Sequence, residues 1–314
     1  MGVDWDILGI GAVAVDDLLY VDHYPLPGSK LQVRAKRREG GGLTATALVA
    51  ASRLGARTAY SSVLGEDELS RFTIQELERE QVDCTPVLRR PEARPYHSIV
   101  IVDQATGERT ILYSMEGVAQ RSPEEITEEL IASCRVLFID HLTASAGLRA
   151  LDLAHTRGIP VVADIEQETR PYALELMRRA DHLIVGIALA ERVTGETRPE
   201  RMVGAFSGAE RACCAVTAGE RGCWYSERGS PVQHFPAFQV RVVDTTGCGD
   251  VFHGAYAACI ARGESVAMAI QVASAAAGLK ATQPGGRRGI PDQAAVDLFL
   301  KENQDYTLFS GGRP

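Results

Sequence analysis

The sequence predicts an α/β fold with a mostly parallel central sheet. Two observations support this prediction: short apolar runs of strand length recur along the chain, and longer helical patterns lie between them. Such alternation is typical of βαβ units, in which each helix connects two parallel strands. No internal repeat or low-complexity linker interrupts the pattern over the 314 residues.

The first quarter of the chain contains two expected strands and two expected helices. Asp6–Val15 is apolar with glycines and is predicted as a buried first strand. Thr44–Leu54 is rich in alanine and ends at Gly55, a natural C-terminal stop for a helix. Arg57–Leu64 then reads as a strand, and Asp67–Glu80 as an amphipathic helix with a charged face.

The alternation continues through the second half of the chain. Strands are expected at four short apolar runs: Val136–Ile139, Ile159–Ala163, His182–Val185 and Ala212–Val216. Helices are expected at five longer segments: Ala146–Arg157, Pro171–Arg179, Pro199–Gly208, Gly249–Arg262 and Ser265–Ala281. The last two are rich in small residues, so we expect them to lie deep in the fold.

Two β-like segments, about residues 30–40 and 95–114, have no helices to cover them. The second contains two runs joined by a turn at Gly107. We expect a small β-element that stands off the main sheet as a lid, with ordinary peripheral strands as the alternative. One domain is expected over residues 1–305, followed by a loose tail at 306–314.

The composition restricts the possible partners. Lys and Arg total 33 against 41 Asp and Glu, a net charge of −8, which argues against nucleic acid or an anionic membrane as the main partner. No apolar run reaches the roughly 18 residues of a membrane span, and no basic signal-peptide region is visible. The chain has seven cysteines, an odd number that cannot all pair, and the sequence contains no CxxC motif. Both features favour reduced thiols and a cytoplasmic location.

Gly9–Ala14 reads GIGAVA and matches the GxGxxA pattern of dinucleotide-binding sites. That site requires a helix directly after the glycines. Here the chain continues with β-branched, acidic and proline residues, so a nicotinamide-dependent oxidoreductase remains only a minor alternative.

Gly40–Gly42 directly precedes the first expected helix. Consecutive glycines let backbone amides approach a polar ligand closely, with help from the helix dipole. Taken alone, these glycines are explained better by a flexible turn.

Val243–Phe252, which reads VDTTGCGDVF, is the most informative motif. The amides of Gly247, Cys248 and Gly249 can form an anion-binding nest at a helix N-terminus. Asp250 in the first turn can accept a proton from a hydroxyl that attacks a phosphoryl group. The alternative is a capped helix whose early acid only complements the helix dipole.

Two long motifs resemble the signatures of PfkB-type carbohydrate kinases, the ribokinase-like superfamily. VVDTTGCGDVFHGA at 242–255 resembles the C-terminal signature, and GGGLTATALVAASRLGA at 40–56 resembles the N-terminal one. TAGERG before the C-terminal motif and KATQPGGRRGIPD after it follow the same order, so the resemblance spans about Asp6 to Leu300. It implies a ribokinase-like three-layer α/β/α fold with a small β lid.

The resemblance also implies roles for individual residues. Asp250 matches the catalytic base, and Gly247, Cys248 and Gly249 match the anion hole. Residues matched to substrate binding are Asp16, Gly41, Gly42 and Thr46. Residues matched to nucleotide binding are Thr217, Gly219, Gly222, Thr245 and Gly286. Asp244 and Thr246 match positions that hold a monovalent cation, such as K⁺, in members activated by one.

Three positions depart from the pattern of the family. The NxxE motif linked to Mg²⁺ falls on Gly186 and Leu189, so neither side chain can do that work. Either water and Asp250 organise the metal, or turnover is impaired. Thr46 replaces a usual Asn, and Cys248 replaces a frequent Ala or Gly. For Cys248 we expect a tolerated small residue rather than an oxidisable thiol.

The motifs look most like those of ketose kinases and, within these, of the sulfofructose kinase branch. In that branch a lysine matching Lys30 helps to hold the acidic group of the substrate. Arg109 on the expected lid faces either an acidic substrate or solvent.

The resulting hypothesis is ATP- and Mg²⁺-dependent transfer of a phosphoryl group to a primary hydroxyl of a ketose, with Asp250 as the base. Nucleoside kinases, sugar-phosphate kinases and a non-catalytic sugar- or nucleotide-binding protein remain as alternatives. The resemblance further implies a homodimer that forms through the lid. No nucleic acid or membrane partner is expected.

Overall fold

The computed structural model describes residues 2–106 and 108–303. The expected turn at Gly107 and the expected tail at 306–314 therefore lie outside the described residues.

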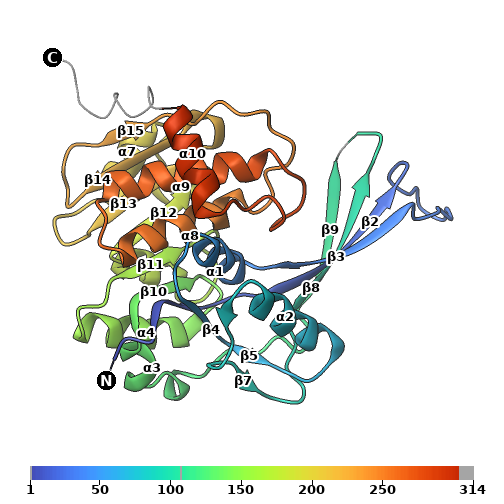
Figure 1. The fold of residues 1–314 in the computed structure, drawn as a ribbon, viewed down its shortest axis with the longest axis horizontal. Helices are drawn as coiled ribbons and strands as arrows, with labels where there is room; N and C mark the ends of the chain where they lie inside the picture. The colour runs from blue at the N-terminus through green and yellow to red at the C-terminus, as the bar shows by residue number, and fades with distance from the viewer. Residues whose placement is uncertain (1, 107, 304–314) are drawn as a thin grey trace.

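A nine-stranded sheet forms the centre of the molecule, in the order β15-β14-β13-β12-β11-β10-β1-β4-β6 (Figure 1). Neighbouring strands from β6 to β13 are parallel, and β14 and β15 continue the sheet as antiparallel strands. The bounds are β1 Trp5–Ile10, β4 Thr58–Ser61, β6 Val82–Asp83, β10 Cys134–Asp140, β11 Val161–Asp164, β12 His182–Gly186, β13 Cys213–Thr217, β14 Cys223–Glu227 and β15 Gln233–Phe235. This arrangement confirms the predicted, mostly parallel sheet.

Helices cover both faces of this sheet (Figure 1). One face packs against α1 Leu43–Arg53, α2 Glu68–Arg79, α8 Cys248–Ala261, α9 Val266–Ala281 and α10 Gln293–Glu302. The other face packs against α3 Glu128–Ala132, α4 Ala144–Thr156, α5 Ala173–Arg179, α6 Ile187–Thr194 and α7 Pro199–Phe206. Successive strand residues point to opposite faces, so Ile7 and Leu8 of β1 lie in different apolar clusters. The predicted three-layer α/β/α fold is confirmed.

The alanine-rich helices α8 and α9 lie deep in the first of these layers, as predicted. Most residues of α8 are buried, from Val251 to Cys259. At Gly254 the backbone of α8 approaches α1 so closely that a Cβ would lie 2.0 Å from the carbonyl oxygen of Ala47. Small residues therefore allow these two helices to pack with their backbones almost in contact.

A second sheet of four strands projects from the body (Figure 1). Its order is β3-β2-β8-β9, with bounds β2 Ala14–Val21, β3 Ala35–Gly41, β8 Tyr96–Asp103 and β9 Arg109–Ser114. We call these four strands and the loop 22–34 the lid. Two short strands form a separate pair: β5 Val63–Leu64 and β7 Leu88–Arg89. In the chain, β5 follows β4 of the central sheet and β7 precedes β8 of the lid.

Three expected strands have other limits in the structure. The expected strand Asp6–Val15 is wrong as a single element, because β1 ends at Ile10 and β2 begins at Ala14 in the lid. Between them the amide of Ala12 donates to a side chain, Asp140 Oδ2 at 2.6 Å, instead of continuing the ladder. The expected strand Arg57–Leu64 divides into β4 and β5, and the polar strand expected from Lys30 begins only at Ala35.

The helices of the described residues include none that is both long and apolar enough to cross a membrane. All seven cysteines lie in the described part of the chain and none forms a disulfide.

Candidate active site

The candidate site lies where the carboxyl ends of the parallel strands meet the first turns of α1 and α8. Asp140, Asp164, Gly186 and Thr217 are the last residues of β10, β11, β12 and β13. In open α/β sheets, ligands bind at this edge because the loops that follow the strands converge there. Most of the residues singled out in the sequence lie at this edge.

The start of α8 offers an open anion-binding surface. Gly247 caps the helix in the left-handed conformation, with φ of 75°. The amides of Gly247 and Gly249 have no acceptor within the described residues, whereas the amide of Cys248 donates to the carbonyl of Thr245 at 3.1 Å. A Cβ at Gly249 would meet no atom within 4 Å. Two of the three expected amides are therefore free to bind an anion.

Asp250 lies in the first turn of α8, beside these amides, with its side chain partly exposed. Burial by the surrounding protein raises the pKa of Asp250 well above its ordinary value. The negative charges of Asp164 and Glu166 raise it further, while His253 and Arg287 act in the opposite direction. A carboxylate with a raised pKa is a stronger proton acceptor, as a general base requires.

Asp164 is the least expected member of this acidic group. Its side chain is 2% exposed, and its Oδ2 has no hydrogen-bond partner in the described part of the chain. The Nδ1 atom of His253 lies 3.5 Å from that oxygen. Burial and the charges of Glu166 and Asp140 raise the pKa of Asp164 well above its ordinary value. His253 is thus its only ion-pair partner among the described residues, and a buried carboxylate oxygen without a hydrogen bond is suited to a further cationic ligand.

The residues at the NxxE positions do not face this acidic group. Gly186 has no side chain, and Leu189 is buried in the apolar cluster on the other face of the sheet. No set of three or more side chains is arranged to bind a metal directly among the described residues. The unpaired Asp164 carboxylate, with Glu166 and Asp250 nearby, fits a Mg²⁺ ion that retains several of its waters. Sequence reasoning missed Asp164 and Glu166, although an acid at the end of an apolar strand was a usable signal.

Asp244 is already surrounded by donors. Its Oδ1 accepts from the backbone and hydroxyl of Thr246 and lies 3.3 Å from Arg109 Nη1, and its Oδ2 accepts from the amide of Gly285. Although burial acts to raise the pKa of Asp244, the hydrogen bonds from Thr246 and Gly285 hold it below its ordinary value. The fully buried Lys280 ammonium donates to the Asp244 carbonyl at 2.9 Å. This charge pattern does not favour a monovalent cation at Asp244 and Thr246.

The residues expected to bind the sugar are brought together between the lid and α1. Asp16 on β2 faces Gly41, where a Cβ would lie 2.5 Å from Asp16 Oδ2. Gly42 adopts φ of 91°, and a Cβ there would lie 2.6 Å from Val13 Cα. Thr46 is buried in the first turn of α1. These contacts explain the glycine run as a requirement of close packing around Asp16.

The expected nucleotide-binding residues lie along the same edge, beyond α8. Thr217 ends β13, and Gly219 and Gly222 lie in the turn that leads to β14. Gly286 packs against the start of α8, because a Cβ at Gly247 would lie 2.7 Å from its carbonyl oxygen. Thr245 is exposed just before that turn.

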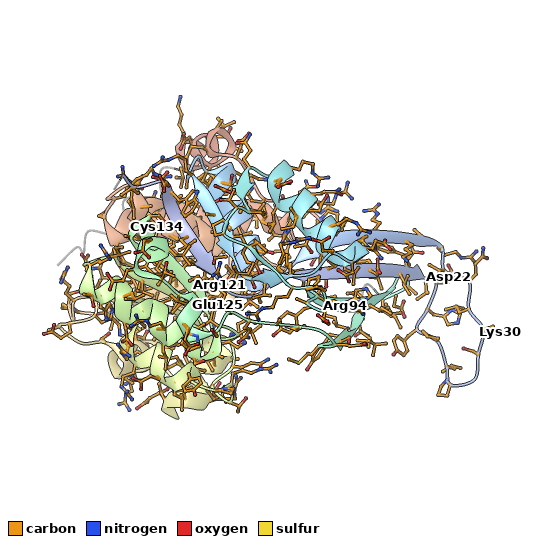
Figure 2. All side chains as sticks on the ribbon, turned by 90° about the horizontal axis from the view of Figure 1, so that it is seen from below. Asp22, Lys30, Arg94, Arg121, Glu125 and Cys134 are labelled. Atoms are coloured by element: carbon orange, nitrogen blue, oxygen red, sulfur yellow. The ribbon has the colours of Figure 1, made fainter. Side chains whose placement is uncertain are left out.

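Two expected substrate residues and one expected anion-hole residue behave differently. Lys30 is exposed at the outer end of the loop 22–34, which projects away from the body of the molecule (Figure 2). Arg109 lies beside Asp244 and not beside the sugar-side residues. Burial raises the pKa of the Cys248 thiol, which agrees with a small tolerated residue rather than a reactive thiolate.

Comparisons with known proteins identify the family of the chain. A family model described as pfkB family carbohydrate kinase matches residues 6–293. A ribokinase from Staphylococcus aureus is 24% identical over 292 residues, which cover 90% of this chain and 95% of the relative. Fructokinase-1 from Zea mays is 28% identical, covering 83% of this chain and 88% of the relative.

Solved structures show the same architecture. A protein from Agrobacterium tumefaciens, provisionally described as a ribokinase, is 28% identical with a TM-score of 0.88, covering 95% of this chain and 98% of the other. Arabidopsis thaliana ribokinase, complexed with ribose and ATP, shares the fold at 20% identity with a TM-score of 0.82, covering 95% and 99%.

Proposed function

Because the chain belongs to the pfkB family of carbohydrate kinases, we propose that it transfers the γ-phosphoryl group of ATP to a primary hydroxyl of a sugar, with Asp250 as the base. The family itself makes the chain a phosphotransferase that acts on a sugar hydroxyl. The observation that carries the proposed roles is the position of Asp250 beside the free amides of Gly247 and Gly249.

Each part of this site has a defined task in the proposed reaction. The Asp250 carboxylate takes the proton of the attacking hydroxyl, and its raised pKa favours that transfer. The Gly247 and Gly249 amides donate to the transferred group as it develops charge. Asp16 binds sugar hydroxyls and holds the acceptor in line. The lid limits access of water, which would otherwise compete with the sugar.

Asp164 and Glu166 are the residues that we propose to hold Mg²⁺ in place of an NxxE motif. When bound, the ion neutralises negative charge on the phosphates. The unpartnered Oδ2 of Asp164 supports this role.

For the substrate we propose a ketose, fructose-like or sulfofructose-like. The GGG-x-x-ATA pattern at 40–47 supports a ketose. The relatives include a ribokinase as well as a fructokinase, so aldoses belong in the same test. The outward position of Lys30 gives no support to a sulfonate contact at that residue (Figure 2).

A second candidate is a protein that binds sugar and nucleotide without transferring a phosphoryl group. The observation that favours it is the absence of polar side chains at Gly186 and Leu189. It predicts binding of both ligands with no turnover.

The test is ATP consumption with Mg²⁺ against a panel of ketoses, sulfofructose, aldoses, sugar phosphates and nucleosides. Asp250→Asn should reduce kcat by a factor of about 10²–10⁴, the usual contribution of a general base. Glu128→Gln, an exposed acid in the first turn of α3, is the matched control and should leave kcat unchanged. Calorimetric binding of sugar and ATP without turnover would support the second candidate instead.

We also propose that two copies of the chain associate through the lid. The edge strand β9 carries Ile111, Leu112 and Tyr113 with 52%, 54% and 63% of their surfaces exposed. Adjacent exposed apolar residues on an unpaired strand edge favour association. Light scattering should give a dimer for the native chain and a monomer for Leu112→Lys, and a native monomer would contradict the proposal.

A further inference from the structure

Arg287 is a buried cation that the proposed reaction does not yet use. It lies in the loop between α9 and α10, directly after Gly285 and Gly286, and its side chain is 7% exposed. Burial lowers the pKa of Arg287 to about 10, against the opposing charges of Asp250 and Asp16. The guanidinium therefore remains protonated near neutral pH.

The guanidinium contacts the start of α1, on the side of the site where the sugar is expected to bind. Its Nε donates to Thr46 Oγ1 at 3.1 Å, and its Nη2 donates to the carbonyl of Gly41 at 2.6 Å. No carboxylate lies within 4.0 Å of it in the described part of the chain. Nη1 has no acceptor there, and it fills the space beside Gly40, where a Cβ would lie 2.3 Å away.

The contact with Thr46 sets the direction of a hydroxyl proton. A threonine hydroxyl has one proton to donate and rotates to suit its partners. Since Oγ1 accepts from Arg287, the proton must point away from the guanidinium. A threonine in a helix often donates to the carbonyl four residues earlier. Here the carbonyl of Gly42 instead accepts the Thr46 amide at 2.9 Å, and Thr46 Oγ1 donates to no described residue.

We propose that Arg287 is a positioning residue of the sugar site. It orients the Thr46 hydroxyl as a donor toward an oxygen of the sugar. The pair of Thr46 and Arg287 thereby selects sugars that present an acceptor oxygen at that point. This inference rests on the proposed function, because it assumes that a sugar binds between Asp16 and Thr46.

Four variants test this role: Thr46→Val, Arg287→Met, Arg287→Lys and the double variant Thr46→Val/Arg287→Met. The matched control is Arg288→Met, which removes the neighbouring but exposed arginine. The measurements are sugar affinity by calorimetry, and KM and kcat for the sugar. Thermal melting and ATP affinity report whether each variant is folded.

Thr46→Val is expected to weaken sugar affinity by about tenfold, the loss of one hydrogen bond of about 1.4 kcal/mol. If Arg287 acts through Thr46, adding Thr46→Val to Arg287→Met should cause little further loss of affinity. Arg287→Lys should not restore the affinity, since it keeps the charge and loses the planar fork that donates to both Thr46 and Gly41.

Independent, additive losses of sugar affinity in the double variant would overturn the orienting role. An equal loss of sugar affinity in Arg288→Met would overturn it as well. Native protein that turns over a sugar while these variants remain unaffected refutes this inference alone. Native protein with no turnover and no sugar binding refutes the proposed function together with it.

Discussion

The helices α1 and α8 of the first layer have similar sequences at their N-termini but different surroundings in the structure. Both begin at glycines: Gly40–Gly42 directly precede α1, and Gly247 caps α8, whose second residue is Gly249. At α1 the space around the glycines is filled by protein, namely the Arg287 guanidinium, the Asp16 carboxylate and the backbone at Val13. At α8 the space beside Gly249 is empty, and the amides of Gly247 and Gly249 lack acceptors.

The acids beside the two helices differ in the same way. Asp140, next to α1, accepts from the Thr44 hydroxyl and from the amides of Ala12 and Leu142. The Oδ2 atom of Asp164, beside His253 of α8, has no hydrogen-bond partner among the described residues. One sequence signal therefore serves two purposes: close packing of the proposed sugar pocket at α1, and an open surface for phosphate at α8. Substitutions at these positions should separate the two.

Gly42→Ala should damage the fold. Its φ of 91° and the 2.6 Å approach to Val13 Cα add conformational strain to a backbone clash. We expect the free energy of unfolding to fall by about 3 kcal/mol or more, measured by urea titration. Gly55→Ala is the control at the other end of α1, where φ is 84° but nothing lies within 4 Å. It should cost only about 1 kcal/mol, and equal losses in the two variants would contradict the packing argument.

Gly249→Ala should damage the chemistry and leave the fold intact. Its methyl group has room, and alanine stabilises a helix by up to about 1 kcal/mol relative to glycine. The same methyl covers part of the anion surface, so kcat should fall by about 10–100-fold, the scale of losing one stabilising donor. Gly204 in α7 also has open space around its ideal Cβ. Gly204→Ala should therefore give the same small gain in stability as Gly249→Ala and leave the activity unchanged. A lowered melting temperature in Gly249→Ala would show that this helix start is packed after all.

Asp164→Asn should become more stable than the native chain as the pH rises, in the absence of Mg²⁺ and ATP. The pKa of Asp164 is raised in the folded state by burial and by Glu166 and Asp140, so its ionisation opposes folding. This penalty is absent below the unfolded pKa of about 3.9 and grows as the pH rises toward the folded value.

We therefore expect the melting temperature of Asp164→Asn to exceed that of the native chain at pH 8, by about 2–4 °C for each kcal/mol gained, and the gain to vanish near pH 4. Asp140→Asn is the control. It removes part of a satisfied acceptor set and should lower the melting temperature at pH 8. A gain for Asp164→Asn that is the same at every pH would contradict the electrostatic explanation.

Gly186→Asn should have the smallest effect. Gly186 caps α6 with an ordinary φ of −71°, and nothing lies within 4 Å of its ideal Cβ. Asparagine is a better N-cap than glycine by only a few tenths of a kcal/mol, so the free energy of unfolding should rise by about that amount. The rate of turnover should stay unchanged, because Leu189 remains in the apolar cluster. An increase in kcat would show that the asparagine alone restores part of the missing motif.

Local sequence patterns predicted many of the helices and strands. The helices at 43–53, 68–79 and 266–281 follow from their apolar spacing and their stop signals. The strand that was expected to continue from Asp6 to Val15 divides because Asp140, far along the chain, takes the amide of Ala12. No local preference within β1 and β2 reports that contact. The helix Ile187–Thr194 and the antiparallel strands β14 and β15 were also missed, since short elements show little periodicity.

The sequence by itself determined the family, the parallel sheet and the place of Asp250 and its glycines, because these depend on contiguous motifs. Tertiary structure alone decided which charges meet across the site. The charges of Asp164 and Glu166, at and just after the end of β11, and of Arg287, between α9 and α10, act on Asp250 from distant parts of the chain. Tertiary structure also placed Arg109 beside Asp244 and Lys30 at the outer end of the lid. The reason is physical: burial and Coulomb interactions depend on distance in space, which neither composition nor spacing along the chain records.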